Sequence, residues 1–485
     1  MGFNRYAIFQ MLGKVLILTG IATSVPILVA KVYGEVEMYS AFYLTAIPSV
    51  LLGLLIQLGM PPSSKAIRIR DGFLVVASVW ILVTLVGSMP FLLSTHMSFP
   101  DAFFEMASGF STTGASILTD IESLPYSILF WRSFTHWLGG LGIVIFAIAL
   151  MPQLNIGGYN ILRAETPGPT YEKISPKFKG QSRILFFIYM GLTLSETLLL
   201  RLGGLSWFDA LVHTFGTVAT GGFSTYNASL GYFQSTYVSL IVTLFMVLSA
   251  LNFTLYYASI KRGLNGFLKD SEFKFYLLVI LVATLFISVD LFRMNYYSYG
   301  IALRESAFQV ASIITTTGYA TVNYDLWPTF SKALLFGLML VGGCSGSTGG
   351  GLKAIRALII LRFIRRGMIT RLHPNAVCSV RLGERSLSGD VITSVAAFSL
   401  LYITTVLLSG LVISGDGHNM VTSLTAALAC VGNIGPGFSG VGPSMNYSVF
   451  SDPIKIFMAF LMLAGRLELF TLFMLFTPRF WNRDR

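Results

Sequence analysis

Long apolar runs alternate with short polar connectors along the whole chain. A helix needs about 20 residues to cross the hydrocarbon core of a membrane, and most of the runs approach that length. The pattern therefore predicts an all-α polytopic membrane protein. Its expected apolar runs are Leu16–Ala30, Ala41–Leu58, Phe73–Leu93, Ile184–Leu200, Val238–Leu251, Phe275–Val289, Val391–Val412 and Ile454–Phe476.

Composition supports the same interpretation. Of the 485 residues, 54% are hydrophobic and only 11% are charged. A soluble domain carries roughly 25% charged residues, so this chain has too few charges to cover a water-facing surface. A large soluble helical core is the alternative that this argues against. The first run is followed directly by a second, so we expect a retained span and not a cleaved signal.

The net charge of +11 is concentrated in a few connectors. Connectors that are nearly free of lysine alternate with them, as the positive-inside rule requires. This asymmetry predicts about ten spans with both termini in the cytoplasm, and it argues against nucleic acid as a partner. The basic segments are Ser63–Arg70, Arg163–Arg183, Lys261–Lys274, Arg362–Arg385 and Arg479–Arg485.

Four segments of the chain repeat one plan. Each has an apolar span (M1), a short apolar segment too short to span (P) that ends in a Gly/Thr turn, and a second span (M2). Two extra spans precede the first repeat. The P segments are Asp101–Ser116, Asp209–Ser224, Glu305–Ala320 and, more divergent, Thr422–Gly437.

The repeats divide the chain into five parts. We expect two N-terminal spans in residues 1–68 and pore repeats in 69–180, 181–270, 271–385 and 386–485.

A glycine recurs at the same place in each P segment. Three segments begin with an acid and have their glycine 13 residues later, at Gly114, Gly222 and Gly318, and Gly435 takes this place in the fourth. In the second repeat a gapless alignment selects Gly222, whereas matching the Thr-Gly pair selects Gly221. Both remain candidates.

The P segments have the chemistry of a cation filter. An initial acid suits a helix N-terminus, so the negative dipole end of each short helix would face the turn. Glycine allows carbonyls to turn inward, and rings of carbonyls replace the hydration shell of potassium. Four ordinary connecting loops are the alternative, which the matching frames disfavour. The candidate ion-binding residues are Thr112, Thr113, Gly114, Thr220, Gly221, Gly222, Thr316, Thr317, Gly318, Asn433, Ile434 and Gly435.

The M2 run of the third repeat is interrupted by ten residues, six of them glycine. Glycine costs about 1 kcal/mol per helix position relative to alanine, so we expect the helix to break there, below the filter. A flexible loop at this depth could obstruct the pore and move aside. Close helix packing is one alternative. A phosphate loop is another, but the GK[ST] ending is missing. The candidate gate is Gly342, Gly343, Cys344, Ser345, Gly346, Ser347, Thr348, Gly349, Gly350 and Gly351.

Arg466 lies inside the last apolar run and is a second gate candidate, because a charge within a membrane is expensive. It could oppose cations and anchor the loop through carbonyls, or it could pair with Glu468 or with an acid of another repeat. Lys353 and Arg356 are expected to be interfacial anchors, with contact to a partner as the alternative. Arg132 and His136 are expected to be structural.

With one filter glycine per repeat, the chain resembles the Trk/Ktr/HKT superfamily of potassium transporters. Trp131–Gly142, Gly342–Gly351 and Leu463–Phe470 resemble the bacterial TrkH branch most closely. The resemblance covers essentially the whole chain and implies a potassium-selective uptake subunit in the bacterial inner membrane. K+ would be the transported ion at the filter residues. The fourth filter, Val431–Gly437, departs most from the family pattern.

The same resemblance implies further properties. Residues 342–351 would be the intramembrane gating loop. A cytosolic nucleotide-binding ring of the TrkA type would regulate the pore, and two copies would form a homodimer with a pore in each. Related plant transporters with serine at the first filter glycine prefer sodium, and Gly114 stands at that position here.

Other functional classes lack their signatures. The three cysteines and five histidines show no metal-ligand or catalytic spacing, so neither an enzyme nor a bound catalytic cofactor is expected. A cation-coupled (Na+ or H+) secondary transporter is the alternative, but its mark would be inverted halves with paired broken helices.

Overall fold

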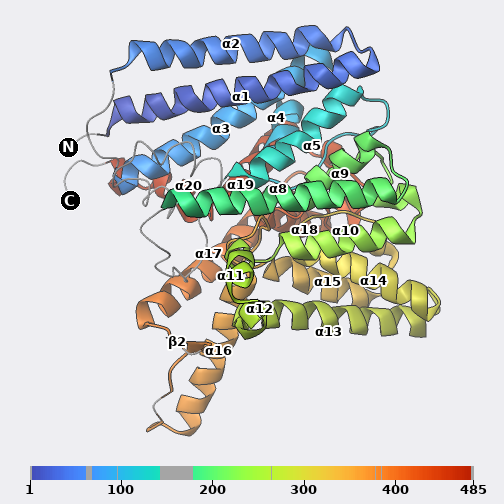
Figure 1. Cartoon of the computed structure of the whole chain (residues 1–485). Coiled ribbons are helices and arrows are strands. Elements are labelled where there is room, and N and C mark those ends of the chain that lie inside the picture. The colour runs from blue at the N-terminus through green and yellow to red at the C-terminus, as the bar shows by residue number, and fades with distance from the viewer. Residues whose placement is uncertain are drawn as a thin grey trace.

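The computed structural model describes residues 3–61, 68–95, 97–142, 178–263, 265–376, 378–383 and 385–481. The described residues are predominantly helical, which confirms the all-α polytopic class (Figure 1). Most of the predicted basic connectors Ser63–Arg70 and Arg163–Arg183 lie outside the described residues.

Two antiparallel helices, α1 (Arg5–Tyr33) and α2 (Met38–Gly59), form a layer at one edge of the molecule (Figure 1). Small residues bring their backbones together. A Cβ on Gly53 would lie 2.6 Å from the carbonyl oxygen of Gly13, so the packing requires the glycine there. The pair contacts the first repeat mainly through α1.

Three helices recur four times in the order expected for M1, P and M2. The M1 helices are α3 (Ile69–Ser94), α8 (Phe178–Leu202), α13 (Ser271–Arg293) and α17 (Gly389–Ser414). The P helices are α4 (Phe99–Phe110), α9 (Trp207–Val218), α14 (Tyr299–Ile314) and α18 (Met420–Gly432). The M2 helices begin with α5 (Tyr126–Gly140), α10 (Thr236–Ser249), α15 (Thr329–Val341) and α19 (Asp452–Arg466).

Every M2 helix ends after 13–15 residues, whereas the sequence pattern predicted a break only in the third repeat. The run Ile454–Phe476 was expected to be continuous but is bent after Arg466, whereas Val238–Leu251 lies almost wholly in α10 and the bend follows it. The axis turns by 90° between α10 and α11 (Phe253–Arg262). It turns by 113° between α19 and the segment that begins with α20 (Phe470–Phe473). The third repeat resumes after its loop as α16 (Ala354–Leu372).

Six helices of the described chain are long and apolar enough to cross a membrane, and eight if each bent pair counts as one span. The other two M2 positions hold α5 and the interrupted pair α15 and α16. The expected M1–P–M2 order is therefore present even where a single M2 helix is too short to span.

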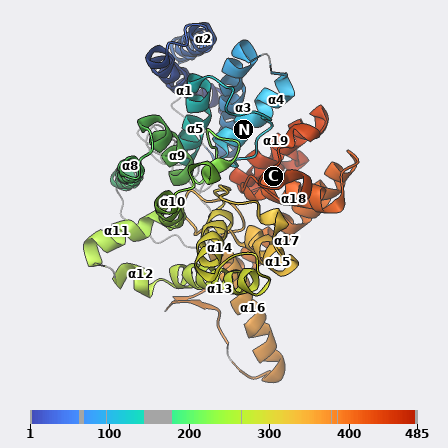
Figure 2. The same ribbon diagram turned by 90° about the vertical axis from the view of Figure 1, so that its right-hand side faces the viewer.

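The four repeats form a closed ring. Each M2 helix contacts the P helix of the next repeat, through α5 with α9, α10 with α14, α15 with α18 and α19 with α4. Figure 2 shows the repeats following one another around the centre in chain order. The P helices are thereby brought together at the middle of the molecule.

The remaining elements are short. They are α12 (Asn265–Lys269), α21 (Pro478–Trp481) and the antiparallel pair β1 (Arg381–Leu382) and β2 (Arg385–Ser386). Single 3-10 turns cover Ser229–Phe233, Tyr324–Leu326, Ser439–Val441, Tyr447–Val449 and Met474–Phe476. Helix α16 extends away from the bundle (Figure 1), and Phe3 near the start of the described chain packs against Phe480 and Trp481 at its end.

Candidate ion pathway

Three of the four P helices have a side-chain cap at the N-terminus, from Ser98, Ser206 and Asn419, whereas α14 has none. Ser98 and Ser206 accept hydrogen bonds from the backbone N–H of Asp101 and Asp209, at 3.3 and 3.0 Å. Both acids therefore lie in the first turn, as expected, where the positive dipole end favours them. Glu305 differs, because α14 begins at Tyr299 and Glu305 lies further along the helix. The third P helix is simply longer at its N-terminal end.

The C-terminal ends of all four P helices have the same capping geometry. In each repeat the N–H of the middle filter residue donates to the carbonyl five residues earlier, and the N–H of the preceding residue donates to the carbonyl three residues earlier. The bond that reaches back five residues is the Schellman pattern, which satisfies part of the helix end. These five-residue bonds join Thr113 to Ser108, Gly221 to Gly216, Thr317 to Ser312 and Ile434 to Ala429, at 2.7–3.0 Å.

Each cap places a residue other than glycine in the left-handed region. The φ angles are 55° at Thr112, 56° at Thr220, 60° at Thr316 and 53° at Asn433. Glycine usually holds this position, and a β-branched residue there is strained by about 1–3 kcal/mol. Asparagine tolerates it better. Such strain is typical of functional sites, where the surroundings fix the backbone.

The same geometry distinguishes Gly221 from Gly222. Gly222 has a φ of 82°, close to the 82°, 84° and 95° of Gly114, Gly318 and Gly435. Gly221 makes the capping bond that Thr113, Thr317 and Ile434 make. The backbone thus follows the gapless alignment, with Gly222 equivalent to the other three glycines.

The four glycines pack in a ring against one another's repeats. A Cβ on Gly114 would overlap the carbonyl oxygen of Gly221, and one on Gly222 or Gly318 would overlap that of Thr317 or Ile434. On Gly435 it would approach the carbonyl oxygen of Thr113 to 2.8 Å, which is less severe. The residue before each glycine therefore directs its carbonyl toward the glycine of the preceding repeat, and side chains are excluded from the contact.

The four glycines also line a single cavity of about 140 Å³. Its walls come from the segments after each P helix, including Tyr226, Pro436 and Tyr447. Burial and the nearby Asp209 carboxylate raise the pKa of the Tyr226 phenol, which keeps it uncharged at neutral pH. Apart from Arg132, the residues that line this cavity have uncharged side chains.

One cation, Arg132, also lines the cavity, but it is paired. Its Nε donates to Glu105 at 2.6 Å, and both side chains are almost completely buried. Glu105 additionally accepts from the hydroxyl of Ser116 and the N–H of Ile117, and Arg132 donates to the carbonyl of Ser224. The pair joins the segments that leave the first and second P helices, which agrees with the structural role expected for Arg132.

The glycine-rich loop lies against the C-terminal ends of several P helices. The Thr348 hydroxyl donates to the carbonyl of Val218 in α9, and the N–H of Gly350 donates to the Thr316 hydroxyl at 2.6 Å. A Cβ on Gly350 would overlap the carbonyl oxygen of Gly432 in α18. The loop therefore contacts P-helix ends of the second, third and fourth repeats.

Arg466 is the last residue of α19, so its expected place in the middle of a continuous span was wrong. Its guanidinium donates to the carbonyl of Thr348 at 2.6 Å and to that of Gly139 at 3.0 Å. Of the two roles considered, these contacts are those of an anchor to carbonyls. Glu468 pairs instead with Arg356, at 2.8 Å.

Lys353 and Arg356 are buried, at 4% and 6% exposure, so the expectation that they are interfacial anchors was wrong. The Lys353 ammonium donates to the carbonyl of Gly349 within the loop. The Arg356 guanidinium lies 3.9 Å over the ring of Phe398 and contacts Glu468. Both cations belong to the packing around the loop.

This architecture is matched by known proteins. The family model for TrkH, described as a cation transport protein, matches residues 41–483. The chain belongs to the TrkH family of cation transport proteins.

Relatives are similar along their full length. The chain is 37% identical over 480 residues to the Trk system potassium uptake protein TrkH of Halomonas elongata, covering 98% of this chain and 99% of the relative. It is 36% identical over 481 residues to the protein of the same name in Escherichia coli strain K12, with the same coverage. The crystal structure of the potassium transporter TrkH from Vibrio parahaemolyticus matches with a TM-score of 0.89 and 33% identity, over 99% of this chain and 100% of that one.

Sequence reasoning missed some members of this TrkH-family site. Glu105 was not singled out, although an acid within an apolar P segment is a signal, because a buried charge needs a partner. The sharp turns of M2 in repeats two and four had a weaker signal. Asn252, next to the break after α10, accepts from the N–H and hydroxyl of Thr254 and so starts a new helix there.

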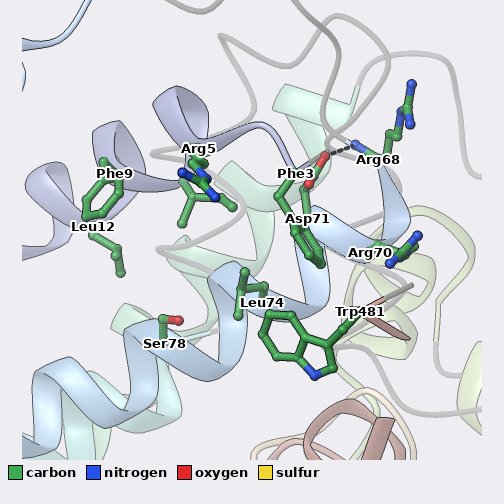
Figure 3. Close-up of a pocket in the computed structure, with 11 residues that line it drawn as sticks. Phe3, Arg5, Phe9, Leu12, Arg68, Arg70, Asp71, Leu74, Ser78 and Trp481 are labelled. Atoms are coloured by element: carbon green, nitrogen blue, oxygen red, sulfur yellow. Dashed lines mark hydrogen bonds between the residues drawn. The ribbon is translucent and has the colours of Figure 1, made fainter. Parts of the chain in front are cut away.

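A larger cavity of about 830 Å³ lies between the N-terminal segment and α3 (Figure 3). Arg5 and Trp481 line it, and Asp71 accepts from the backbone N–H of Asn4 and Arg68 at its edge. None of the predicted filter or loop residues lines this cavity. It is therefore separate from the ion pathway.

Proposed function

We propose that the chain is the potassium-selective, ion-conducting membrane subunit of a K+ uptake system. The observation that carries this proposal is the ring of four equivalent glycines around one cavity, each packed against a carbonyl of the next repeat. Potassium filters work by replacing hydration water with backbone carbonyls. The names of the relatives, potassium uptake proteins, support potassium as the ion.

In this proposal the filter consists of the candidate residues of the four turns. The carbonyls before the glycines, from Thr113, Gly221, Thr317 and Ile434, face the ion. Gly222 is the filter glycine of the second repeat. The Thr and Asn side chains brace the turns. For example, the Asn433 amide donates to the Thr113 hydroxyl and to the carbonyl of Met462, both at 2.9 Å.

The glycine-rich loop is the gate in this proposal. It is held against the inner ends of the P helices by hydrogen bonds to Val218 and Thr316, and Arg466 fixes it from a different repeat. A guanidinium close to the pathway also opposes cations electrostatically. Opening requires the loop to leave these contacts.

The proposal includes the setting of the subunit. The protein lies in the bacterial inner membrane with both termini in the cytoplasm, which the basic connectors and the contact of Phe3 with Phe480 support. Two copies pair, and a cytosolic ring of the TrkA type regulates them, as the family resemblance implies. The projecting helix α16, which carries Arg362, Arg365 and Arg366, offers a basic surface on that side.

Ion flux into liposomes tests the proposal. Purified protein should carry K+ and Rb+ much faster than Na+ and Li+, and protein-free liposomes should carry none of them. Equal permeability to Li+ and K+ would overturn the filter. The ring of four repeats favours a channel-like path over a cation-coupled transporter. In a coupled transporter, K+ flux would depend on a gradient of Na+ or H+.

A further inference from the structure

Glu272 is a buried acid that the proposed filter and gate do not use. It lies in the first turn of α13, the M1 helix of the third repeat, and its exposed fraction is 5%. A carboxylate at that depth needs strong partners. Its partners lie on the glycine-rich loop and just after it.

One carboxylate oxygen of Glu272 accepts two hydrogen bonds from opposite ends of the loop region. The N–H of Ser345, near the start of the loop, donates to Oε1 at 2.6 Å. The N–H of Ile355, just after the loop, donates to the same oxygen at 3.2 Å. The two donors are ten residues apart in the chain, so a single atom holds the loop closed on itself.

The second bond also caps a helix. Ile355 lies in the first turn of α16, whose N-cap residue Lys353 makes no side-chain capping bond and has a φ of 77°. The first N–H groups of a helix need an acceptor, and the positive dipole end favours a carboxylate. Glu272, from helix α13, supplies the capping acceptor that the N-cap residue of α16 does not provide. The start of α16 is therefore held by this carboxylate together with the carbonyl of Gly343, which accepts from the N–H of Ala354 at 2.9 Å.

We propose that Glu272 is the latch of the glycine-rich loop: its carboxylate holds the loop under the filter and fixes the start of α16. This positioning role rests on the proposed function of the loop as a gate. If the loop leaves the pore, Ser345 must separate from Ile355, and both bonds to Glu272 must break. Glu272 lies beside the basic connector Lys261–Lys274, since α13 follows α12 directly and contacts both α12 and α16. A displacement of that connector can therefore be transmitted to the loop.

Cys344 reports on the loop independently of ion flux. Its side chain is 1% exposed, and its N–H donates to the carbonyl of Ala250, so the thiol is accessible only when the loop moves. With Cys378→Ser and Cys430→Ala, which replace the other two cysteines, the rate of maleimide labelling measures loop displacement. The measurement is made on the full chain in liposomes together with Rb+ and Na+ flux.

Glu272→Gln should raise both the labelling rate of Cys344 and the basal Rb+ flux by about tenfold, because a bond to a charged acceptor is replaced by a weaker neutral one. The Rb+/Na+ ratio should not change. Glu272→Asp keeps the charge and should fall between the parent and Glu272→Gln. Asp290→Asn is the matched control. It removes a carboxylate at the other end of α13, which accepts from Ser331 at 2.6 Å, and should leave labelling unchanged.

Unchanged labelling and flux in a folded Glu272→Gln protein would overturn the latch. A loss of ion discrimination together with faster flux would also overturn it, because the residue would then support the filter. If instead the parent protein carries no selective flux, the proposed function fails. Faster labelling in Glu272→Gln would still establish the loop contact.

Discussion

Alanine substitutions at the four ring glycines test the geometry of the pathway most directly. The residues are Gly114, Gly222, Gly318 and Gly435, and all four have φ between 82° and 95°. An alanine at such an angle costs about 1–2 kcal/mol in each case. This common cost cannot distinguish the four positions.

The contact with the next repeat does distinguish them. At Gly114, Gly222 and Gly318 the new Cβ would overlap a carbonyl oxygen, and relief to ordinary contact requires a displacement of about 1 Å. At Gly435 the separation is already 2.8 Å, so a shift of about 0.6 Å, roughly half of that needed at the other positions, restores ordinary contact. The substitution at Gly435 should therefore disturb its carbonyl neighbour least.

The effect on selectivity follows from the lost carbonyl. A contact between a charged and a polar group contributes about 1.5–3 kcal/mol, and each 1.4 kcal/mol is a factor of ten. Displacing one carbonyl at Gly114, Gly222 or Gly318 should lower the Rb+/Na+ flux ratio by about 10- to 100-fold. Gly435→Ala should lower it by less than about tenfold.

Rb+ and Na+ flux in liposomes, with protein content matched by size-exclusion chromatography, measures these ratios. Gly263→Ala is a control for the backbone cost alone, since Gly263 has a φ of 70° and no atom within 4 Å of its Cβ position. Two results would refute the reasoning. One is equal damage at all four ring positions, and the other is a larger loss at Gly435 than at Gly318.

Three further predictions concern the gate and the bracing pair. Thr316→Val removes the hydroxyl that accepts a hydrogen bond from the N–H of Gly350 in the loop. Losing one hydrogen bond of about 1 kcal/mol should raise basal Rb+ flux about fivefold. Arg466→Gln loses charge-assisted bonds to two repeats and should raise basal flux by at least about tenfold in the same assay. Glu105→Gln leaves Arg132 without its buried counter-charge and should destabilise the protein by about 3–5 kcal/mol in thermal or denaturant unfolding.

Two of these predictions have a matched control, and all three have a result that would contradict them. Thr220→Val matches Thr316→Val, because the Thr220 hydroxyl donates to the carbonyl of Ala219 in its own turn and not to the loop. Higher flux in both valine variants would contradict the role of the loop contact. Unchanged flux in Arg466→Gln would contradict its anchoring role. For the pair, Glu105→Gln combined with Arg132→Met should recover much of the lost stability, and simple addition of the two losses would argue against coupling.

The sequence determined the class and the repeat of this protein. Apolar runs of spanning length allow little besides a membrane bundle, because the lipid core offers no partner for backbone polar groups. The recurrence of a glycine 13 residues into each P segment identified four equivalent turns. The six glycines after Val341 predicted a break, because glycine destabilises a helix wherever it lies.

Only the tertiary structure decided what depends on contacts between repeats. Gly221 and Gly222 cannot be ranked by composition, whereas the backbone places Gly222 in the ring with Gly114. The bends after Ser249 and Arg466 have only a weak signal in the sequence, such as Asn252, and only the fold shows that the chain turns there by 90° and 113°. Buried charges such as Glu272 can be noticed in the sequence, but their partners lie 70 or more residues away, and only the fold brings them together.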